Sequence, residues 1–363
     1  MADAPDLGGY EVVGRLAVGG MAEVYQARAR VTTQRSPGEP DEIVIKRLHP
    51  SFRSDTAYVK AFVDEAKLTV RLRHPNIVRT YRLFKAGPDY LMVQELVSGR
   101  TLGYMQELLV KAGAAMPPES ACYIAWCLLK ALDYIHRAKV GENGATIVHR
   151  DVNPANLLLG INGDVKLTDF GVAEVEGLMR GDSGALRGTL PYMSPEQVLG
   201  LPVDARTDLY AVGIILWELW SGRRLFAGEH EAELMHKVRD ARVPLLTSSP
   251  ELPDYAVQVA RKALFADRAR RFQTAAEFIK ALESLSRRAG WPLTVEALQP
   301  LLGAEMRSRR AVILGLLGGG LAVSGCLGSV PFRPRAYEDA VRVVGFQVDF
   351  RQDGTGVLDL DRR

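Results

Sequence analysis

Three side chains with oxygen donors lie in two short segments near the middle of the chain. Asp151 and Asn156 occur in HRDVNPAN, residues 149–156, and Asp169 begins DFG thirteen residues after Asn156. Carboxylate and amide oxygens are ligands that the hard cation Mg²⁺ takes. A single carboxylate in a turn is most often a cap or a solvated charge. Two aspartates flanking an asparagine at this spacing make that interpretation less favourable, and Asn156 and Asp169 are the candidate magnesium ligands.

A second group of residues could hold a phosphate. The segment LAVGGMAEV, Leu16–Val24, places Gly19 and Gly20 between two strand-like stretches. Glycine lets backbone N–H groups approach phosphate oxygens without interference from a Cβ atom. Lys46 ends the apolar run IVIK on the following strand, and Glu65 lies in the first helical stretch. A glycine loop alone would be an ordinary hairpin, so it is Lys46 that favours a phosphate site.

The elements that must position these residues change in character along the chain. Up to about residue 96, alternating apolar and polar residues predict an antiparallel sheet, and residues 56–72 have helical periodicity. Beyond about residue 100, long apolar stretches predict buried and amphipathic helices. We therefore expect an α+β fold with a small β-rich lobe and a larger, mainly helical lobe. The predicted strands cover residues 10–18, 23–30, 42–48, 77–86 and 90–96, and the later helices cover 119–138, 207–222, 254–266 and 274–290.

The composition excludes several classes of protein. The 363 residues carry a net charge of only +3, with 47% hydrophobic and 25% charged residues, which is typical of a soluble globular chain and indicates no nucleic-acid partner. The three cysteines, Cys122, Cys127 and Cys326, form no CxxC pair, so we expect neither a disulfide framework nor a cysteine metal site. Residues 1–9 lack the apolar run of a secretory signal, and none is expected there.

Taken in order, these motifs resemble the eukaryotic-type (Hanks-type) protein kinases. GGMAEVY, GTLPYMSPE and TDLYAVG are particularly similar to the bacterial serine/threonine members. The resemblance covers roughly residues 10–285 and implies a two-lobed fold that transfers phosphate from ATP, with Mg²⁺, to serine or threonine hydroxyls of proteins. The expected divisions are an N-terminal extension (1–9), an N-lobe (10–96), a C-lobe (97–288), a juxtamembrane segment (289–310), an apolar segment (311–330) and a tail (331–363).

The resemblance also implies roles for the residues described above. Lys46 would contact the α- and β-phosphates of ATP and pair with Glu65. Asp151 would be the catalytic base that accepts the proton of the acceptor hydroxyl, and Asn156 and Asp169 would hold Mg²⁺.

The nucleotide pocket follows from the same resemblance. Glu95 and Val97 would offer backbone hydrogen bonds to the base, and Gln94 would guard the back of the pocket. Ala17 and Ala22 stand where the family usually has glycine, which would stiffen the loop. The residues expected to bind ATP are Leu16, Ala17, Val18, Gly19, Gly20, Met21, Ala22, Val24, Val44, Lys46, Glu95, Val97 and Leu158.

Asn153 departs from the family pattern, in which a lysine that touches the transferring phosphoryl group is usual. Its amide can donate a hydrogen bond but carries no charge, and charge-assisted hydrogen bonds are roughly twice as strong as neutral ones. We expect a loss of about 1–3 kcal/mol of transition-state stabilisation, or a roughly tenfold to hundredfold slower reaction. Asn153 is therefore interpreted as a catalytic residue of a working site. A pseudokinase that binds ATP as a membrane-tethered module is the alternative.

The activation segment would run from Asp169 to Glu196. Arg150, next to the catalytic base, would receive a phosphate from this segment. Ser183, in the glycine-rich stretch RGDSGALRG, is the regulatory candidate, with an unregulated loop serine as the alternative. Thr189 in GTLPY is expected to shape the substrate platform more than to regulate.

Two structural contacts are expected to support the catalytic residues. Glu196 in SPE would pair with Arg271, and Asp208 in TDLY would hold the backbone of the catalytic loop. Loss of either contact should destabilise the fold rather than remove chemistry.

Residues 311–330 form a twenty-residue run without a charge, preceded by three arginines. That length just spans a bilayer core, and the arginines would mark the cytoplasmic side. We expect a transmembrane helix that leaves the kinase lobes in the cytoplasm. A packed helix of a soluble protein, and a lipoprotein-like signal ending at Cys326, are the alternatives.

The expected partners are protein substrates with serine or threonine acceptors, a sensor or activating partner, and the membrane. A small-molecule kinase of related fold is a further alternative, which the long segment around SPE disfavours.

Overall fold

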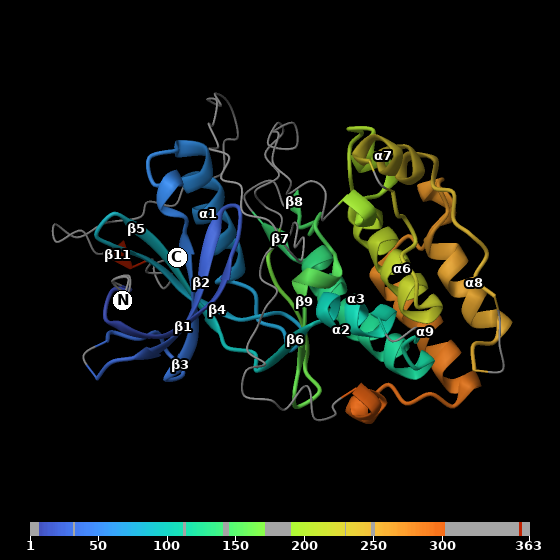
Figure 1. Cartoon of the computed structure of the whole chain (residues 1–363), viewed down its shortest axis with the longest axis horizontal. Helices are drawn as coiled ribbons and strands as arrows, with labels where there is room; N and C mark the ends of the chain where they lie inside the picture. Colours follow the sequence, from blue (N-terminus) through green and yellow to red (C-terminus); the bar gives the residue numbers. More distant parts are fainter. Residues whose placement is uncertain are drawn as a thin grey trace.

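The computed structural model describes residues 7–31, 33–111, 114–140, 145–170, 190–228, 230–247, 251–301 and 356–357. A sheet-rich lobe with one long helix lies beside a lobe built mainly of helices (Figure 1). This arrangement confirms the expected α+β architecture.

The sheet of the first lobe is antiparallel, with the strand order β1-β2-β3-β5-β4-β11. Its third strand is buried on both faces over Ile43, Val44, Ile45 and Lys46. Because a strand covered on both sides needs apolar residues at successive positions, the run IVIK does not alternate. The strands are β1 (Tyr10–Val18), β2 (Ala22–Ala29), β3 (Glu42–Leu48), β4 (Thr80–Ala86), β5 (Asp89–Glu95) and β11 (Gly356–Val357).

The two faces of this sheet have different covers. On one face Leu7, from the stretch before β1, is fully buried among Tyr10, Phe84 and their neighbours. The other face packs against α1 (Thr56–Thr69), through Phe62 and Met92 among others. The second cover fixes the helix that carries Glu65.

The ends of α1 have local causes. Asp55 is its N-cap, and its Oδ1 accepts a hydrogen bond from the backbone N–H of Ala57 at 3.0 Å. The helix ends at Thr69, earlier than the predicted 72. The chain turns there because Leu72 and Ile77 are buried in the core of the other lobe.

The second lobe is built around α3 (Pro118–Arg137) and α6 (Ala205–Ser221). Every residue of α6 from Thr207 to Trp220 is buried, as expected for an apolar central helix. A Cβ atom on Gly213 would come within 2.7 Å of Ala263 Cβ, so only glycine allows α6 and α8 this approach. The other helices are α2 (Leu102–Lys111), α5 (Pro195–Val198), α7 (Glu231–Asp240), α8 (Asp254–Ala263) and α9 (Ala275–Ala289).

The remaining elements are short strands and 3₁₀ turns. They are the strands β6 (Gly99–Thr101), β7 (Lys139–Val140), β8 (Ala145–Thr146), β9 (Leu157–Gly160) and β10 (Val165–Leu167), and the turns η1 (Pro50–Phe52), η2 (Pro154–Asn156), η5 (Leu190–Tyr192), η6 (Arg268–Arg270) and η7 (Val295–Leu301). Strands β10, β9 and β6 form one small antiparallel sheet.

The apolar segment 311–330 lies outside the described residues. Within the described ranges, no helix combines the length and apolar character needed to cross a membrane. From the tail, β11 pairs antiparallel with β4, Gly356 opposite Lys85 and Val357 opposite Phe84.

Candidate active site

Lys46, Glu65 and Asp169 form a buried ion cluster between the lobes. The Lys46 ammonium lies 2.8 Å from Glu65 Oε1 and 2.8 Å from Asp169 Oδ1. Burial lowers the pKa of Lys46, but the two carboxylates more than offset this and raise its pKa above the ordinary value. The structure thus brings together three predicted site residues, with the two carboxylates stabilising the charged form of the lysine.

The hairpin of β9 and β10 places the two candidate metal ligands at the same end. Asn156 directly precedes β9, Asp169 follows β10, and Thr168 N donates to the Asn156 carbonyl at 3.0 Å. Asp169 has a φ angle of 54°, a left-handed backbone that is costly for a residue other than glycine. This conformation turns the carboxylate toward Lys46.

The side chain of Asn156 has one satisfied end and one open end. Nδ2 donates to Asp151 Oδ2 and to the Asp151 carbonyl, both at 2.9 Å. Oδ1 is buried, and within the described part of the chain it has no hydrogen-bond partner. An unpaired buried acceptor is costly, whereas Mg²⁺ takes such oxygens and is usually held by one or two side chains and phosphate oxygens. Asn156 and Asp169 therefore fit a magnesium ion.

Asp151 is oriented by two neutral amides. Asn153 Nδ2 donates to its Oδ1 at 2.8 Å, and Asn156 Nδ2 donates to its Oδ2. These neutral N–H donors fix the plane of the carboxylate, which orients a group that must accept a proton.

Asn153 has a role in the structure that sequence reasoning missed. Its Oδ1 accepts hydrogen bonds from the backbone N–H groups of Ala155 and Asn156, at 2.9 and 3.2 Å, and so caps η2. The sequence signal is an asparagine followed by proline, the N-cap and N1 residues that helices favour. Contact with a phosphoryl group stays a prediction beside this cap and the hydrogen bond to Asp151.

Asn153→Ala is expected to lower kcat roughly tenfold to hundredfold, because a hydrogen bond to a charged group contributes about 1.5–3 kcal/mol. Loss of the cap should also cost about 1 kcal/mol of unfolding free energy. Asn153→Asp is the matched control, since it keeps the capping oxygen and removes the donor. The Asn153→Asp variant should retain more of the thermal stability than Asn153→Ala, while its kcat should fall as well. Unchanged kcat in the alanine variant, measured by steady-state transfer, would contradict this role.

Asp208 holds the start of the catalytic loop, as predicted. Its carboxylate accepts from the backbone N–H groups of His149 at 2.9 Å and Arg150 at 2.8 Å. His136 of α3 also contacts it, with Nε2 2.7 Å from Oδ2. Nothing in the sequence marks His136, because its partner is far along the chain. Arg150 itself has a φ angle of 67°, so these contacts hold a strained backbone next to Asp151.

The residues predicted to enclose the adenine meet in one apolar cluster. Both lobes contribute to it, and Val78 is the member that the sequence does not single out. Its buried members are Val24, Val44, Val78, Val97 and Leu158, with Leu16 and Ala17 packed against them. The Glu95 side chain pairs with Lys166 at 2.8 Å. The predicted contact of Glu95 with adenine would therefore be made by its backbone.

The loop between β1 and β2 is closed by a hydrogen bond from Gly19 N to Ala22 O at 2.8 Å. Gly20 has open space where a Cβ atom would lie, and Val18 is half exposed. The side chains of Met21 and Ala22 pack with α1, so these two residues can offer only backbone groups to a phosphate.

Ser183 and Thr189 lie outside the described residues. Beyond them, Arg271 donates to both oxygens of Glu196, at 2.7 and 2.9 Å, which confirms the predicted pair.

The short helix α5 is tied to the catalytic loop. Ser194 and Gln197 form a capping box, and Gln197 Nε2 donates to the Arg150 carbonyl at 2.8 Å. The spacing S-x-x-Q is the signal that could have identified this box.

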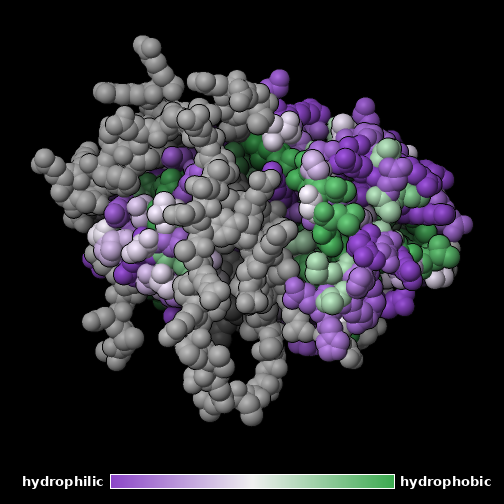
Figure 2. Space-filling model, turned by 90° about the horizontal axis from the view of Figure 1, so that it is seen from above, coloured by the Kyte–Doolittle hydropathy of each residue, from purple (hydrophilic) through white to green (hydrophobic). Residues whose placement is uncertain are grey.

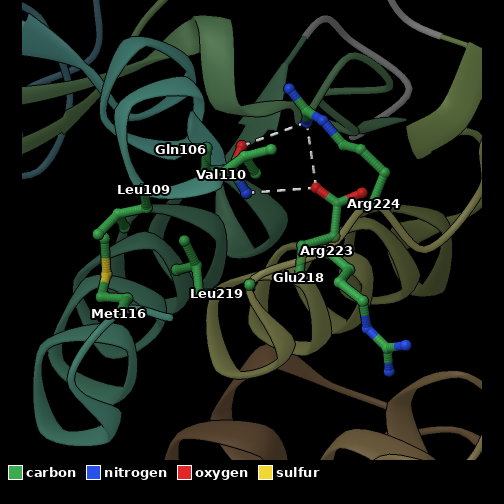
Figure 3. Close-up of a pocket in the computed structure, with 9 residues that line it drawn as sticks. Gln106, Leu109, Val110, Met116, Glu218, Leu219, Arg223 and Arg224 are labelled. Carbon is green, nitrogen blue, oxygen red and sulfur yellow. Dashed lines mark hydrogen bonds and ion pairs between the residues drawn. The ribbon is translucent and has the colours of Figure 1, made fainter. Parts of the chain in front are cut away.

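The turn η5 is anchored by Glu218, a buried carboxylate of α6. Tyr192 OH donates to Glu218 Oε2 at 2.7 Å, Gln106 Nε2 donates to it at 3.2 Å, and Arg224 Nη1 lies 3.2 Å from the same oxygen. Figure 3 shows Gln106 and Arg224 directed at Glu218, while Arg223 extends away from it. Arg224 also bonds Tyr192 OH, so the network joins α2, η5 and α6.

Arg224→Met is expected to raise the KM for a peptide acceptor about tenfold while the KM for ATP stays within about twofold. Removing the guanidinium leaves the buried oxygens of Glu218 and Tyr192 underpaired, which costs about 1–3 kcal/mol and loosens η5. Arg223→Met is the matched control, because that side chain lies outside the network, and it should leave both constants unchanged. Equal acceptor KM values for the two variants would contradict the anchoring role.

An antiparallel β lobe beside a helical lobe, with a lysine–glutamate pair and an Asp/Asn ligand set between them, defines the protein-kinase class. Residues 10–284 match the protein kinase domain family, and the chain belongs to this family.

Curated relatives include bacterial kinases with two kinds of name. The chain is 32% identical over 281 residues to the tyrosine-protein kinase MasK of Myxococcus xanthus, covering 76% of this chain and 43% of MasK. It is 35% identical over 297 residues to the probable serine/threonine-protein kinase SCO3848 of Streptomyces coelicolor, covering 78% and 41%. The chain thus spans about two fifths of the length of these relatives.

Among solved structures, the crystal structure of the Mycobacterium tuberculosis PknI kinase domain, a point mutant, is similar with a TM-score of 0.56 and 27% identity. The match covers 79% of this chain and 100% of that one.

Proposed function

We propose that this chain is an ATP- and Mg²⁺-dependent serine/threonine protein kinase of bacterial signalling. The single observation that carries the proposal is the contact of Lys46 with both Glu65 and Asp169. Through this contact, Lys46, which would bind the ATP phosphates, lies next to Asp169, which would bind the metal ion. The phosphate-binding and metal-binding parts of the site are thus assembled together.

The residues divide the work as follows. Lys46 binds the α- and β-phosphates, and Asn156 and Asp169 hold Mg²⁺, which neutralises charge on the β- and γ-phosphates when bound. Asp151 orients the acceptor hydroxyl and takes its proton, and Arg150 receives an activating phosphate.

The nucleotide lies between the glycine loop and the apolar cluster. The backbone of residues 18–22 covers the phosphates, and the cluster that includes Val44 and Leu158 encloses the adenine. Backbone groups of Glu95 and Val97 bind its edge. The boundary between the lobes is placed at residues 96 and 97.

The proposal includes two claims: the chain phosphorylates serine or threonine, and it is catalytically active. MasK is named a tyrosine-protein kinase, whereas SCO3848 is named a serine/threonine-protein kinase. A pseudokinase is not favoured, because the base, the ligand pair and the Lys46–Glu65 pair are all in place. The substrates of this kinase would be proteins with serine or threonine acceptors. A sensor or activating partner would supply the activating signal.

The test is phosphate transfer from labelled ATP with Mg²⁺ by the full chain to itself and to a generic basic protein, followed by phosphoamino-acid analysis. Labelled serine or threonine is the expected result. Labelled tyrosine alone would overturn the specificity. ATP binding without transfer, even with a phosphomimetic activation segment, would favour the pseudokinase.

We further propose that residues 311–330 anchor the kinase in the membrane with its lobes in the cytoplasm. Their length and the preceding arginines support this. The pairing of β11 with β4 opposes it, because a spanning segment would separate the tail from the lobes. Protease protection of an epitope at residue 363 in intact spheroplasts separates the two arrangements, since a membrane span exposes the epitope outside.

A further inference from the structure

Helices α6 and α8 and the connection between α7 and α8 enclose a cavity of about 240 Å³ in the helical lobe. Its lining includes Trp217 of α6, residues 243–246 of the connection, and Val257 and Ala260 of α8. Trp217 Nε1 donates to the Pro244 carbonyl at 3.2 Å, which holds the connection against α6. None of the described lining residues belongs to the candidate active site, so the cavity is a separate feature of the molecule.

The packing of α6 against α8 explains why this space exists. The two helices approach closely at Gly213, where a Cβ atom would lie 2.7 Å from Ala263 Cβ. The large indole of Trp217 follows about one turn further along α6, and Ala260 of α8 lines the same cavity with only a methyl group. Packed interiors contain few voids larger than a water molecule. This cavity is an exception, and apolar cavities take up apolar ligands.

Arg261 gives the cavity a single cationic group. Val257, Arg261 and Leu264 follow one another at intervals of four and three residues, which places them along one face of α8 and its C-cap. Of the described residues that line the cavity, Arg261 alone is charged. Its guanidinium has no hydrogen bond or ion pair within the part of the chain that the structure describes. An arginine whose stem covers apolar surface and whose charge is solvated is the ordinary interpretation, but here the charge lies in the stripe of cavity-lining residues.

The surface next to the cavity is apolar as well. Leu245, one of the lining residues, is 79% exposed. Apolar patches also interrupt the polar surface of the helical lobe on the face shown in Figure 2. Exposed apolar surface of this kind marks binding sites when it is contiguous. An apolar cavity with one unpaired cation therefore fits a ligand that has an apolar chain and an anionic head.

We propose that this cavity binds the alkyl chain of a free fatty acid and that Arg261 holds its carboxylate. Pockets for drug-sized ligands measure roughly 300–1,000 Å³, so this smaller space suits one slender chain and leaves no room for the two chains of a phospholipid. A guanidinium pairs with a carboxylate through two parallel hydrogen bonds, which gives the head of the ligand a specific partner. The proposal uses no residue of the nucleotide or acceptor site and is independent of the proposed function.

The experiment follows the tryptophan fluorescence of the full chain. The ligands are a long-chain fatty acid brominated along its chain, the methyl ester of this acid, both below the concentration at which they form micelles, and vesicles of a brominated phospholipid. Bromine quenches tryptophan only on close approach, and Trp217 is the one of the four tryptophans that lines the cavity. Trp217→Phe removes the reporter, Val257→Phe fills the cavity, and Arg261→Gln removes the cation. Arg287→Gln, at an exposed position of α9, is the matched control for the lost charge.

We expect saturable quenching of the unchanged chain by the free acid, which should bind about tenfold more tightly than the ester. Arg261→Gln should weaken binding of the acid about tenfold and change binding of the ester less than about twofold. Comparing two ligands across one substitution isolates the carboxylate contact, since all other effects of the substitution are common to both. Val257→Phe should weaken both ligands, and Arg287→Gln should change neither.

Three results would overturn the proposal. Undiminished quenching in Trp217→Phe would place the ligand elsewhere in the molecule. Equal weakening of acid and ester by Arg261→Gln would reduce Arg261 to a packing role. Absence of saturable quenching by the free acid, including the case in which only the phospholipid vesicles quench, would show that the cavity takes up no free fatty acid.

Discussion

Asp151→Asn is expected to lower the rate of phosphoryl transfer by about 10³-fold while the affinity for ATP stays within about twofold. A positioned general base contributes about 10²–10⁴-fold, and asparagine cannot accept the hydroxyl proton. The new amide would also face the amide of Asn153 or Asn156 with a donor instead of an acceptor. Single-turnover transfer and ATP displacement, measured on the same preparation, separate the two effects.

Asp133→Asn is the matched control for this loss. Asp133 lies on α3 in a partly exposed i,i+4 pair with Arg137 at 2.9 Å. Exposed pairs of this kind contribute about 0–1 kcal/mol and touch no reacting group, so its rate should be unchanged. An Asp151→Asn variant that keeps more than a tenth of the activity would remove Asp151 from the role of base.

Arg271→Met is expected to lower the free energy of unfolding by about 3–5 kcal/mol, the cost of removing one partner of a buried ion pair. The Arg271 side chain is fully buried, bonds both oxygens of Glu196, and donates to the carbonyls of Phe265 and Ala266 at 2.7 and 2.9 Å. Its loss removes the cationic partner of the buried Glu196 carboxylate, which keeps the hydrogen bond from the Thr207 hydroxyl at 3.0 Å, and it removes the Arg271 donors from the two carbonyls. Urea unfolding followed by circular dichroism measures the change.

Arg268→Met serves as the control for Arg271→Met. Arg268 is partly exposed, and its ion pair with Asp204 is long, at 3.9 Å. Its effect should stay below about 1 kcal/mol. Equal destabilisation by the two variants would show that the buried pair adds nothing to the fold.

The same pair makes stability depend on pH. Burial raises the pKa of Glu196, but Arg271 more than offsets this and holds the pKa below its ordinary value of 4.5. A carboxyl whose folded pKa is depressed contributes stability above its unfolded pKa, and that contribution is lost as the pH falls through the folded pKa. The unchanged chain should therefore lose this contribution below about pH 4.5, whereas Arg271→Met lacks it already at neutral pH.

The amino-acid sequence was sufficient to predict the elements and the contacts that follow a repeated local pattern. Alternation and helical periodicity predicted the five strands and the main helices, with errors of a few residues at the ends. Lys46 with Glu65, Glu196 with Arg271 and Asp208 with the catalytic loop were each predicted from recognisable motifs. These features are accessible because hydrogen bonding along a strand or helix depends on neighbouring residues, and because each motif keeps its residue types in a fixed order.

Other features appear only once distant segments pack together. Asn153 was singled out in the sequence because the family usually has a charged lysine at this position. Its capping of η2 and its hydrogen bond to Asp151 depend on the path of the loop. His136 reaches Asp208 because α3 lies against α6, and Leu7 is buried because the stretch before β1 folds over the sheet.

The unpaired oxygen of Asn156 shows the same division most clearly. The sequence does not tell whether this amide oxygen is solvated or hydrogen-bonded. Burial decides the matter, because removing water from a polar atom makes the absence of a partner costly. Which atoms lose their water is a property of the packed lobes, and among the described residues the buried Oδ1 of Asn156 is such an atom.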